Sequence, residues 1–271
     1  MQAPTASEPA WSPPGPLLGM VHVGPLSSAA RAGPPLGDQV DAAVRDARTL
    51  ADAGFDAVIV ENMHDTPYVH GRQDPAVVAS MTRLVGAVVE AAGVPAGVQI
   101  LSGGNREAIA VAAATGANFV RCENFAYAHV ADEGLLAQAE AGPLLRYRRR
   151  IGAESVAVLA DVKKKHASHA LTGDLTLADA CRGTRFFGAD AIVVTGSATG
   201  ERTDPGDVRA AREAVDGPVL VGSGASPEDA AALLQHADAL IVGSWVKVDG
   251  RWHNPVDAGR ARRMVEAVRN S

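Results

Sequence analysis

Eight short apolar runs, each followed by an amphipathic segment, recur along the sequence from about residue 17 onward. Nearly every residue within a run is apolar, as in Ala191-Ile192-Val193-Val194. Strands that are buried on both faces have this pattern, and they occur in parallel sheets covered by helices. The eight runs predict strands at 17–23, 57–62, 96–101, 118–124, 155–162, 189–196, 218–224 and 239–247.

The segments between the runs have apolar residues at three- and four-residue steps, which predicts helices. These helices are expected at 38–53, 75–92, 105–115, 142–152, 176–187, 204–215, 226–236 and 257–269. Eight strand–helix units in roughly 250 residues predict a single-domain α/β protein, a (β/α)8 TIM barrel. An open doubly wound sheet is the alternative, but the first run leads into Gly24-Pro25-Leu26 and not into a G-x-G-x-x-G turn. We expect the barrel to span 17–271 and a Pro-rich, mobile tail to span 1–16.

Charge and composition exclude several classes of protein. Lys and Arg number 25 against 31 Asp and Glu, a net charge of −6, which argues against nucleic acid or an anionic membrane as the main partner. We find no apolar run of about 18 residues and no secretory signal pattern, so we expect no membrane span. Cys122 and Cys181 lack metal-ligand spacing, which favours a reducing cytoplasm.

The last three strand ends carry small residues of the kind that lets backbone N–H groups approach an anion. In a TIM barrel the active site lies at the carboxyl ends of the strands, and the last two loops commonly bind phosphate. These same glycines would also permit tight turns without any ligand. The predicted phosphate-binding residues are Thr195, Ser197, Gly222, Ser223, Gly224, Gly243 and Ser244.

Three carboxylates, Glu61, Glu123 and Asp161, follow strands two, four and five and are expected to converge over the barrel mouth. Lys163 shares side-chain parity with Asp161, and the pair should project to one side of its strand. Such acids can act as general acid and base, or stabilise positive charge at a sugar anomeric carbon. The alternative is a rim of charge pairs that only holds the barrel together. His22 ends the first strand and is either a donor to substrate or a hydrogen-bonded rim residue.

No cofactor is predicted, because the histidines and cysteines lack the spacing of a metal site. A divalent metal held by Glu61, Asp161 and a substrate phosphate stays open, since such a site leaves little spacing signature.

Several motifs in order along the chain resemble those of the BtpA/SgcQ family. They are Gly19-Met20-Val21-His22, Val60-Glu61-Asn62, Arg121-Cys122-Glu123-Asn124, Arg146-Tyr147-Arg148-Arg149, Ala160-Asp161-Val162-Lys163-Lys164-Lys165-His166-Ala167, Thr195-Gly196-Ser197-Ala198-Thr199-Gly200, Gly222-Ser223-Gly224 and Pro255-Val256-Asp257. The resemblance covers about 17–260 and implies a TIM barrel. It implies less about activity, because the family is named for photosystem I assembly and for a sugar-utilisation gene cluster. The chain departs from the family at Cys122-Glu123 and at Gly103-Gly104-Asn105.

The function predicted first is an enzyme that makes or breaks a glycosidic bond at the anomeric carbon of a phosphorylated sugar or nucleotide. Asp161 is the favoured catalytic residue, with Glu61, Lys163, His22 and Glu123 as further candidates. An aldose–ketose isomerase or epimerase of a sugar phosphate is the first alternative, with Glu61 or Asp161 as base. A non-catalytic assembly factor is the second. We expect a cytoplasmic homo-oligomer whose partner is a small phosphorylated molecule.

Overall fold

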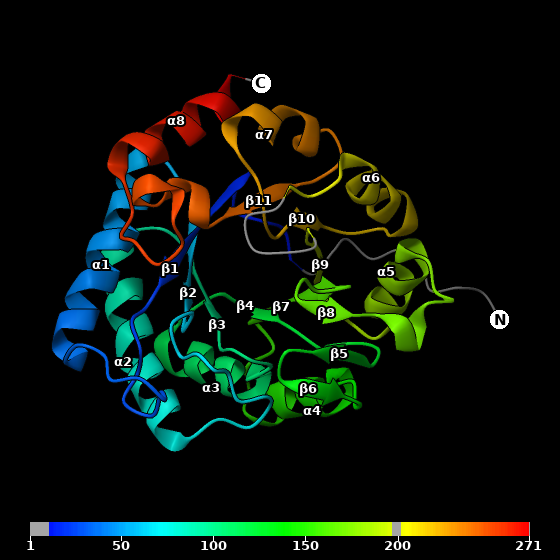
Figure 1. Cartoon of the computed structure of the whole chain (residues 1–271), viewed down its shortest axis with the longest axis horizontal. Helices are drawn as coiled ribbons and strands as arrows, with labels where there is room; N and C mark the ends of the chain where they lie inside the picture. The colour runs from blue at the N-terminus through cyan, green and yellow to red at the C-terminus, as the bar shows by residue number, and fades with distance from the viewer. Residues whose placement is uncertain (1–10, 197–201, 271) are drawn as a thin grey trace.

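A closed barrel of eight parallel strands forms the centre of the computed structural model, which describes residues 11–196 and 202–270 (Figure 1). The strands follow the order β1-β11-β10-β9-β7-β4-β3-β2 around the barrel. Their bounds are β1 Leu17–His22, β2 Ala57–Glu61, β3 Ala96–Gln99, β4 Phe119–Cys122, β7 Ala157–Val162, β9 Ala191–Val194, β10 Val219–Val221 and β11 Ala239–Val242. The predicted (β/α)8 barrel is therefore confirmed.

The helices surround the barrel as an outer ring (Figure 1). They are α1 Leu36–Ala53, α2 Pro75–Ala92, α3 Asn105–Thr115, α4 Ala141–Arg150, α5 Leu177–Phe186, α6 Pro205–Ala214, α7 Pro227–Leu234 and α8 Ala258–Arg269. Short 3-10 turns occur at Ala170–Thr172, Ser244–Val246 and Val248–Gly250. Local sequence explains the helix ends: the side chain of Asp74 accepts the N–H of Ala76 at the start of α2, and Gly93 ends that helix with φ +69°.

The strand predictions overshoot at the carboxyl ends. The last run was expected to extend to Lys247, whereas β11 ends at Val242 and residues Ser244–Val246 form a 3-10 turn. Apolar residues continue past the end of the strand because Val246 is buried under α8, so hydrophobicity alone does not mark where the hydrogen-bonded ladder stops.

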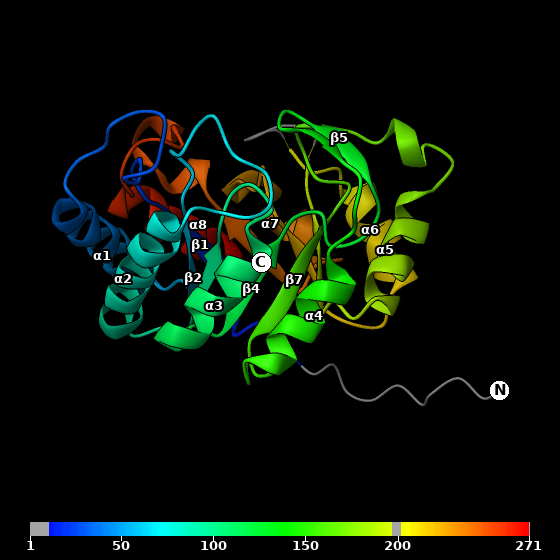
Figure 2. The same cartoon turned by 90° about the horizontal axis from the view of Figure 1, so that it is seen from below.

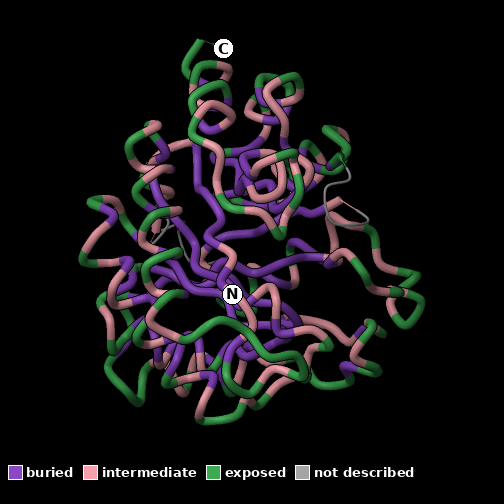
Figure 3. The backbone as a smooth tube through the Cα atoms, turned by 60° about the vertical axis from the view of Figure 1, so that its left-hand side comes forward, coloured by how far each residue is buried: buried purple, intermediate pink, exposed green. Residues whose placement is uncertain are grey.

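The core has two parts, one on each face of the barrel wall. Buried residues follow one another along the barrel strands, as Figure 3 shows. The larger lies between the strands and the outer helices. The smaller fills the inside of the barrel with inward-facing side chains from every barrel strand except β3, among them Met20, Ile59, Phe119, Val193 and Ile241. On β3 the inward-facing residue is Gly97, against which the Phe119 ring packs. Strand residues alternate in direction, so the polar residue two positions beyond each of these must also face inward.

Residues 11–16, which we expected to belong to the mobile tail, pack against the barrel. The Trp11 ring lies 5.8 Å from the ring of Phe119, and the Pro16 carbonyl accepts a hydrogen bond from the Leu240 N–H. Trp11 therefore covers the inner core cluster at the end of the barrel where the strands begin. The remainder of the predicted tail, 1–10, lies outside the described residues.

A three-stranded antiparallel sheet, which the sequence analysis missed, sits beside the carboxyl ends of the barrel strands (Figure 2). Its strands are β5 His129–Ala131, β6 Gly134–Leu136 and β8 Ala167–Ser168. The β5–β6 hairpin comes from the segment after β4, and β8 comes from the segment after β7.

Helix α2 is the part of the described chain that bears on the expected absence of membrane spans. It is long and apolar enough to cross a bilayer by length and composition. In the structure it is an outer helix of the barrel, packed between α1 and α3, with Val77, Met81, Leu84, Val85 and Val88 buried in the core.

Candidate active site

One polar or small residue from each strand forms a layer above the inner apolar core, at the carboxyl end of the barrel. Each lies two residues beyond an inward-facing residue of the same strand, which is Gly97 on β3 and a member of the inner core on every other barrel strand, and so shares its face. In chain order these residues are His22, Glu61, Gln99, Arg121, Asp161, Thr195, Gly222 and Gly243. Polar and charged side chains therefore come from β1, β2, β3, β4 and β7, and small residues follow β9, β10 and β11.

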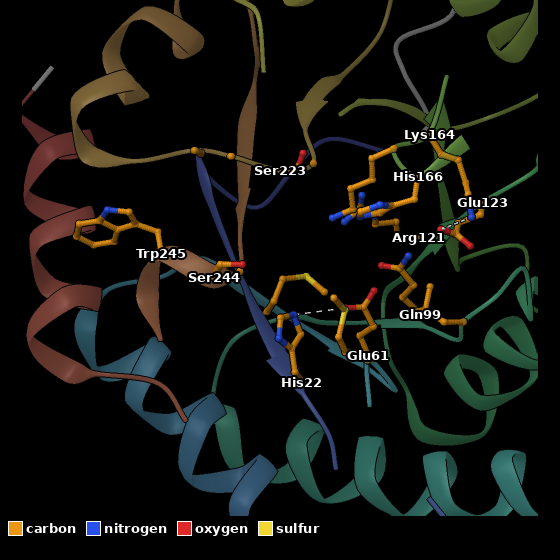
Figure 4. A pocket seen from close by; sticks show the side chains of 18 of the residues that line it. His22, Glu61, Gln99, Arg121, Glu123, Lys164, His166, Ser223, Ser244 and Trp245 are labelled. Atoms are coloured by element: carbon orange, nitrogen blue, oxygen red, sulfur yellow. Dashed lines mark ion pairs between the residues drawn. The ribbon is translucent and has the colours of Figure 1, made fainter. Parts of the chain in front are cut away.

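A cavity of about 400 Å³ opens above this layer (Figure 4). Its size is within the range of small-molecule sites, which are roughly 300–1,000 Å³. The lining includes the predicted residues His22, Glu61, Glu123, Gly222, Ser223, Gly224, Gly243 and Ser244. The structure therefore brings most of the predicted site together in one place.

His22 and Glu61 form a buried pair on neighbouring strands, with 3.4 Å between His22 Nε2 and Glu61 Oε2. His22 Nδ1 lies 2.8 Å from the Trp252 carbonyl, which can only accept, so Nδ1 carries the proton and Nε2 is free to accept. Burial, with Lys247 nearby, lowers the pKa of His22 well below its usual value. Burial raises the pKa of Glu61 to about 7, against the opposing effect of Arg121. The pair thus has one exchangeable proton near neutral pH.

Arg121 donates to both carboxylate oxygens of Asp161, from Nε at 2.8 Å and from Nη2 at 3.1 Å. Both side chains are almost fully buried. Burial raises the pKa of Asp161, and the Arg121 guanidinium opposes this shift. Arg121 lines the main cavity, whereas Asp161 lines a separate cavity of about 20 Å³. Asp161 therefore holds Arg121 in place and does not itself face the main cavity.

The expected pairing of Lys163 with Asp161 is wrong. Strand β7 ends at Val162, and Lys163 has a left-handed backbone with φ 48°, so the strand parity no longer applies. Its ammonium donates to the Leu175 carbonyl at 2.8 Å and lines the smaller cavity. The next two residues, Lys164 and Lys165, line the main cavity, and Lys164 lines the smaller cavity as well.

Glu123 lies at the edge of the cavity next to the small sheet. Its carboxylate accepts a hydrogen bond from Ser102 Oγ at 3.3 Å and lies 3.3 Å from Lys164 Nζ. The same ammonium lies 3.8 Å from Glu133 in the β5–β6 turn. Lys164 thus links the barrel to the hairpin through two carboxylates. Asp132 and Glu133 of that turn also line the cavity.

The opposite end of the cavity is formed by residues 222–226 and 243–245, which follow β10 and β11. Two cations lie there: Arg260, whose Nε donates to the Trp245 carbonyl at 2.5 Å, and Arg202, 3.2 Å from Asp229. A Cβ atom added to Gly222 would lie 2.5 Å from Val193 Cγ1 and 2.8 Å from Arg121 Nη2, so both side chains need a glycine at this position. Gly224 has φ 70°, which favours glycine.

The hydroxyl groups predicted to bind phosphate have varied roles. Thr195 Oγ1 accepts the Lys165 N–H at 3.2 Å, and Ser223 Oγ accepts the Gly196 N–H at 2.9 Å, so both hold neighbouring loops in place. Ser197 lies outside the described residues.

The metal site that the sequence left open, Glu61 with Asp161, is not formed, because Asp161 uses both oxygens to accept from Arg121. Within residues 11–196 and 202–270 no three His, Cys, Asp or Glu side chains are arranged to hold a metal ion. Cys122 and Cys181 are free thiols buried in the core.

Sequence reasoning did not select several residues that line the cavity. Gln99 and Arg121 are strand-end residues that parity alone would have placed in the inner layer. Arg202 lies in the segment between β9 and α6, and Arg260 lies in the first turn of α8, and no local pattern marks either of them.

A closed parallel barrel with a charged cavity at the carboxyl ends of its strands defines a TIM-barrel protein of the kind whose site is built from strand-end residues. The chain belongs to the BtpA family, whose model matches residues 14–270. It is 37% identical over 254 residues to the photosystem I biogenesis protein BtpA of Synechocystis, covering 93% of this chain and 88% of that protein. It is 39% identical over 257 residues to an uncharacterized mitochondrial protein of Caenorhabditis elegans, covering 93% and 92%.

Solved structures of low sequence identity share the fold. Thiamine phosphate pyrophosphorylase from Pyrococcus furiosus has a TM-score of 0.59 at 14% identity, covering 94% of this chain and 96% of its own. (S)-3-O-geranylgeranylglyceryl phosphate synthase from Thermoplasma acidophilum, in complex with sn-glycerol-1-phosphate, has a TM-score of 0.58 at 16% identity, covering 95% and 94%. These likenesses concern the barrel alone.

Proposed function

We propose that this chain is an enzyme that acts on a phosphorylated sugar or a closely related phosphate ester. The phosphate would be held after β10 and β11, where Gly224 and Gly243 leave room for backbone N–H groups and Arg260 supplies positive charge. The thiamine phosphate and glyceryl phosphate enzymes of similar fold are named for phosphate compounds, which supports the same substrate class here.

The reaction that the charges favour is aldose–ketose isomerisation or epimerisation. The observation that carries it is Glu61, whose buried carboxyl group has a pKa raised to about 7 and which shares the cavity with Arg121 and Lys165. A base with a pKa near the working pH is well suited to remove a proton from a carbon next to a carbonyl. The guanidinium of Arg121 would then stabilise the negative enediolate oxygen. The hydroxyl proton would pass from one enediolate oxygen to the other, and Glu61 would return the carbon-bound proton to the neighbouring carbon.

Glycosidic-bond chemistry, which the sequence favoured, becomes the second candidate. Protonated Glu61 could donate its proton to a leaving group, which supports this reaction. Of the three carboxylates expected to stabilise positive charge, however, Asp161 is paired with Arg121, and Glu123 lies beside Lys164. Asp161 is therefore proposed as a positioning residue, with Glu61 and His22 as the catalytic pair and Glu123 as a substrate-contacting residue.

The test is deuterium exchange. Aldose and ketose phosphates of three to six carbons are incubated with the protein in D₂O, and incorporation at carbon is followed by proton NMR. We expect at least one sugar phosphate to exchange, and Glu61→Gln to slow exchange by about 10²-fold or more. Hydrolysis of a nucleotide without exchange would instead select the glycosidic reaction. Absence of binding to every phosphate ester would leave the assembly-factor alternative, which the name of the Synechocystis relative suggests.

The phosphate end has its own test at Gly243. A Cβ atom added there meets Met20 and His22 only at ordinary contact distances of 3.4 to 3.6 Å, so Gly243→Ala should fold and bind normally. Gly243→Glu adds a carboxylate to the proposed anion site, and we expect phosphate esters to lose about tenfold or more in affinity by calorimetry. Equal binding by both variants would place the phosphate elsewhere.

The cytoplasmic location and homo-oligomeric state expected from the sequence are part of this proposal. Light scattering of the purified protein and fractionation of its host cells test them. The name of the worm relative places that protein in mitochondria.

A further inference from the structure

Gln99 is the last residue of β3 and belongs to the inner polar layer. It is paired in register with Glu61 on β2. The register between β3 and β4 runs through Gly97 with Phe119 and Val98 with Val120, which places Arg121 on its other side. The side chain is only 3% exposed, and its amide points into the cavity between Glu61 and Arg121 (Figure 4).

The amide oxygen of Gln99 is buried and has no hydrogen-bond donor among the described residues. A buried polar atom without a partner is costly and is uncommon in folded proteins. An apolar residue of the same shape would fit a purely structural position better. An amide that faces a cavity is suited to a ligand group that both donates and accepts, and a hydroxyl group does both.

The position of Gln99 also indicates where on the ligand this group must be. In the strand order of the barrel, β3 lies diametrically opposite β10, which carries the loop at the phosphate end. Glu61 lies beside Gln99 on β2. A ligand held at both places must span the mouth, with several carbons between its phosphate and the hydroxyl group that meets Gln99.

We propose that Gln99 is a specificity-determining residue that hydrogen bonds with a hydroxyl group at the end of the substrate remote from its phosphate. The site would then select polyol and sugar phosphates over alkyl phosphates of equal length. This inference rests on the proposed function, because it takes the phosphate end as the anchor. Gln99 performs no proton transfer in the reaction; it orients the hydroxyl-bearing end of the chain beside Glu61.

Calorimetric titration with ribitol 5-phosphate and n-pentyl phosphate tests the proposal. The two esters have the same number of carbons, and neither has a carbonyl that could react. Wild-type protein should bind ribitol 5-phosphate about tenfold or more tightly than n-pentyl phosphate. Gln99→Met keeps the side-chain length and removes both polar atoms, so it should weaken ribitol 5-phosphate about tenfold and leave n-pentyl phosphate unchanged.

The matched control is Gln73→Met, since Gln73 bonds to the Val69 and Gly71 carbonyls outside the cavity. It should keep the wild-type preference. If Gln99→Met does not fold, Gln99→Asn takes its place, because the shorter amide no longer reaches and the preference should again fall. If the Gln99 variants keep the wild-type preference for ribitol 5-phosphate, the proposed role of Gln99 is wrong, whereas the proposed phosphate site is unaffected. Failure of wild-type protein to bind either ester overturns both proposals.

Discussion

The carboxyl group of Glu61 is buried beside His22, and its pKa is raised from 4.5 to about 7. The folded protein therefore holds a proton that the unfolded chain has already released between these two pH values. The stability that goes with this proton is fully present below pH 4.5 and is lost as the pH rises through 7. Activity that uses the carboxylate as a base should rise over the same interval.

The substitution Glu61→Gln should remove this dependence of the stability on pH. Glutamine stays neutral, so the free energy of unfolding of the variant should exceed that of wild type by about 2–3 kcal/mol at pH 8. The two proteins should be equally stable at pH 4. Urea unfolding at both pH values measures the difference. A constant difference between the proteins across this range would mean that Glu61 titrates as an ordinary surface acid.

Asp161→Asn tests the pairing with Arg121. The variant leaves a buried guanidinium without its counter-charge, and we expect it to destabilise the fold by about 3–5 kcal/mol as well as to reduce activity. The double variant Arg121→Met with Asp161→Leu should recover most of the stability and none of the activity. If Asp161→Asn were as stable as wild type, Arg121 would not depend on the charge of Asp161, and Asp161 would again be a candidate catalytic carboxylate.

At the scale of the elements, the barrel strands and helices could be predicted because burial on both faces makes each strand apolar. The inner polar layer could be predicted from parity, which applies to Glu61 and Asp161. Parity fails at Lys163, where the backbone leaves the strand with φ 48°. The β5–β6 hairpin was missed because its strands have three residues each, and Leu135 is exposed, so no alternating apolar pattern marks them.

The hairpin is attached to the barrel through Lys164, and this attachment can be tested. Lys164→Met would leave Glu123 and Glu133 facing one another without the ammonium between them. We expect backbone amides of β5 and β6 to exchange with deuterium about tenfold faster in the variant. Lys163→Met is the matched control, since the ammonium of Lys163 donates to the Leu175 carbonyl and not to Glu123 or Glu133. Equal rates of exchange in the two variants would show that the three-stranded sheet does not depend on the contacts of Lys164 with Glu123 and Glu133.

On the scale of the whole molecule, the barrel is covered at one end and open at the other. Trp11 covers the inner core where the strands begin, and the cavity lies where they end. Composition could not predict this, because the residues before β1 are rich in proline and a single tryptophan carries no periodicity. Only the three-dimensional structure shows that Trp11 packs against Phe119.

Trp11→Ala should lower the free energy of unfolding by about 1–3 kcal/mol, since it exposes the inner core to water. Binding of phosphate esters at the far end should stay within about twofold of wild type. Chemical unfolding and calorimetry measure the two effects separately. A loss of binding together with stability would show that the base of the barrel and the cavity are coupled.

The close approach of Arg121 to Gly222 has a consequence for how such a barrel can change through evolution. A side chain at position 222 would collide with Val193 and with the Arg121 guanidinium, which crosses the barrel from β4 to β10. A larger residue at 222 is therefore acceptable only after both Val193 and Arg121 have been replaced by shorter residues, and the loss of Arg121 leaves Asp161 without its partner. Substitutions at these four positions must arise in a particular order. Lineages that keep the arginine are thereby committed to the glycine.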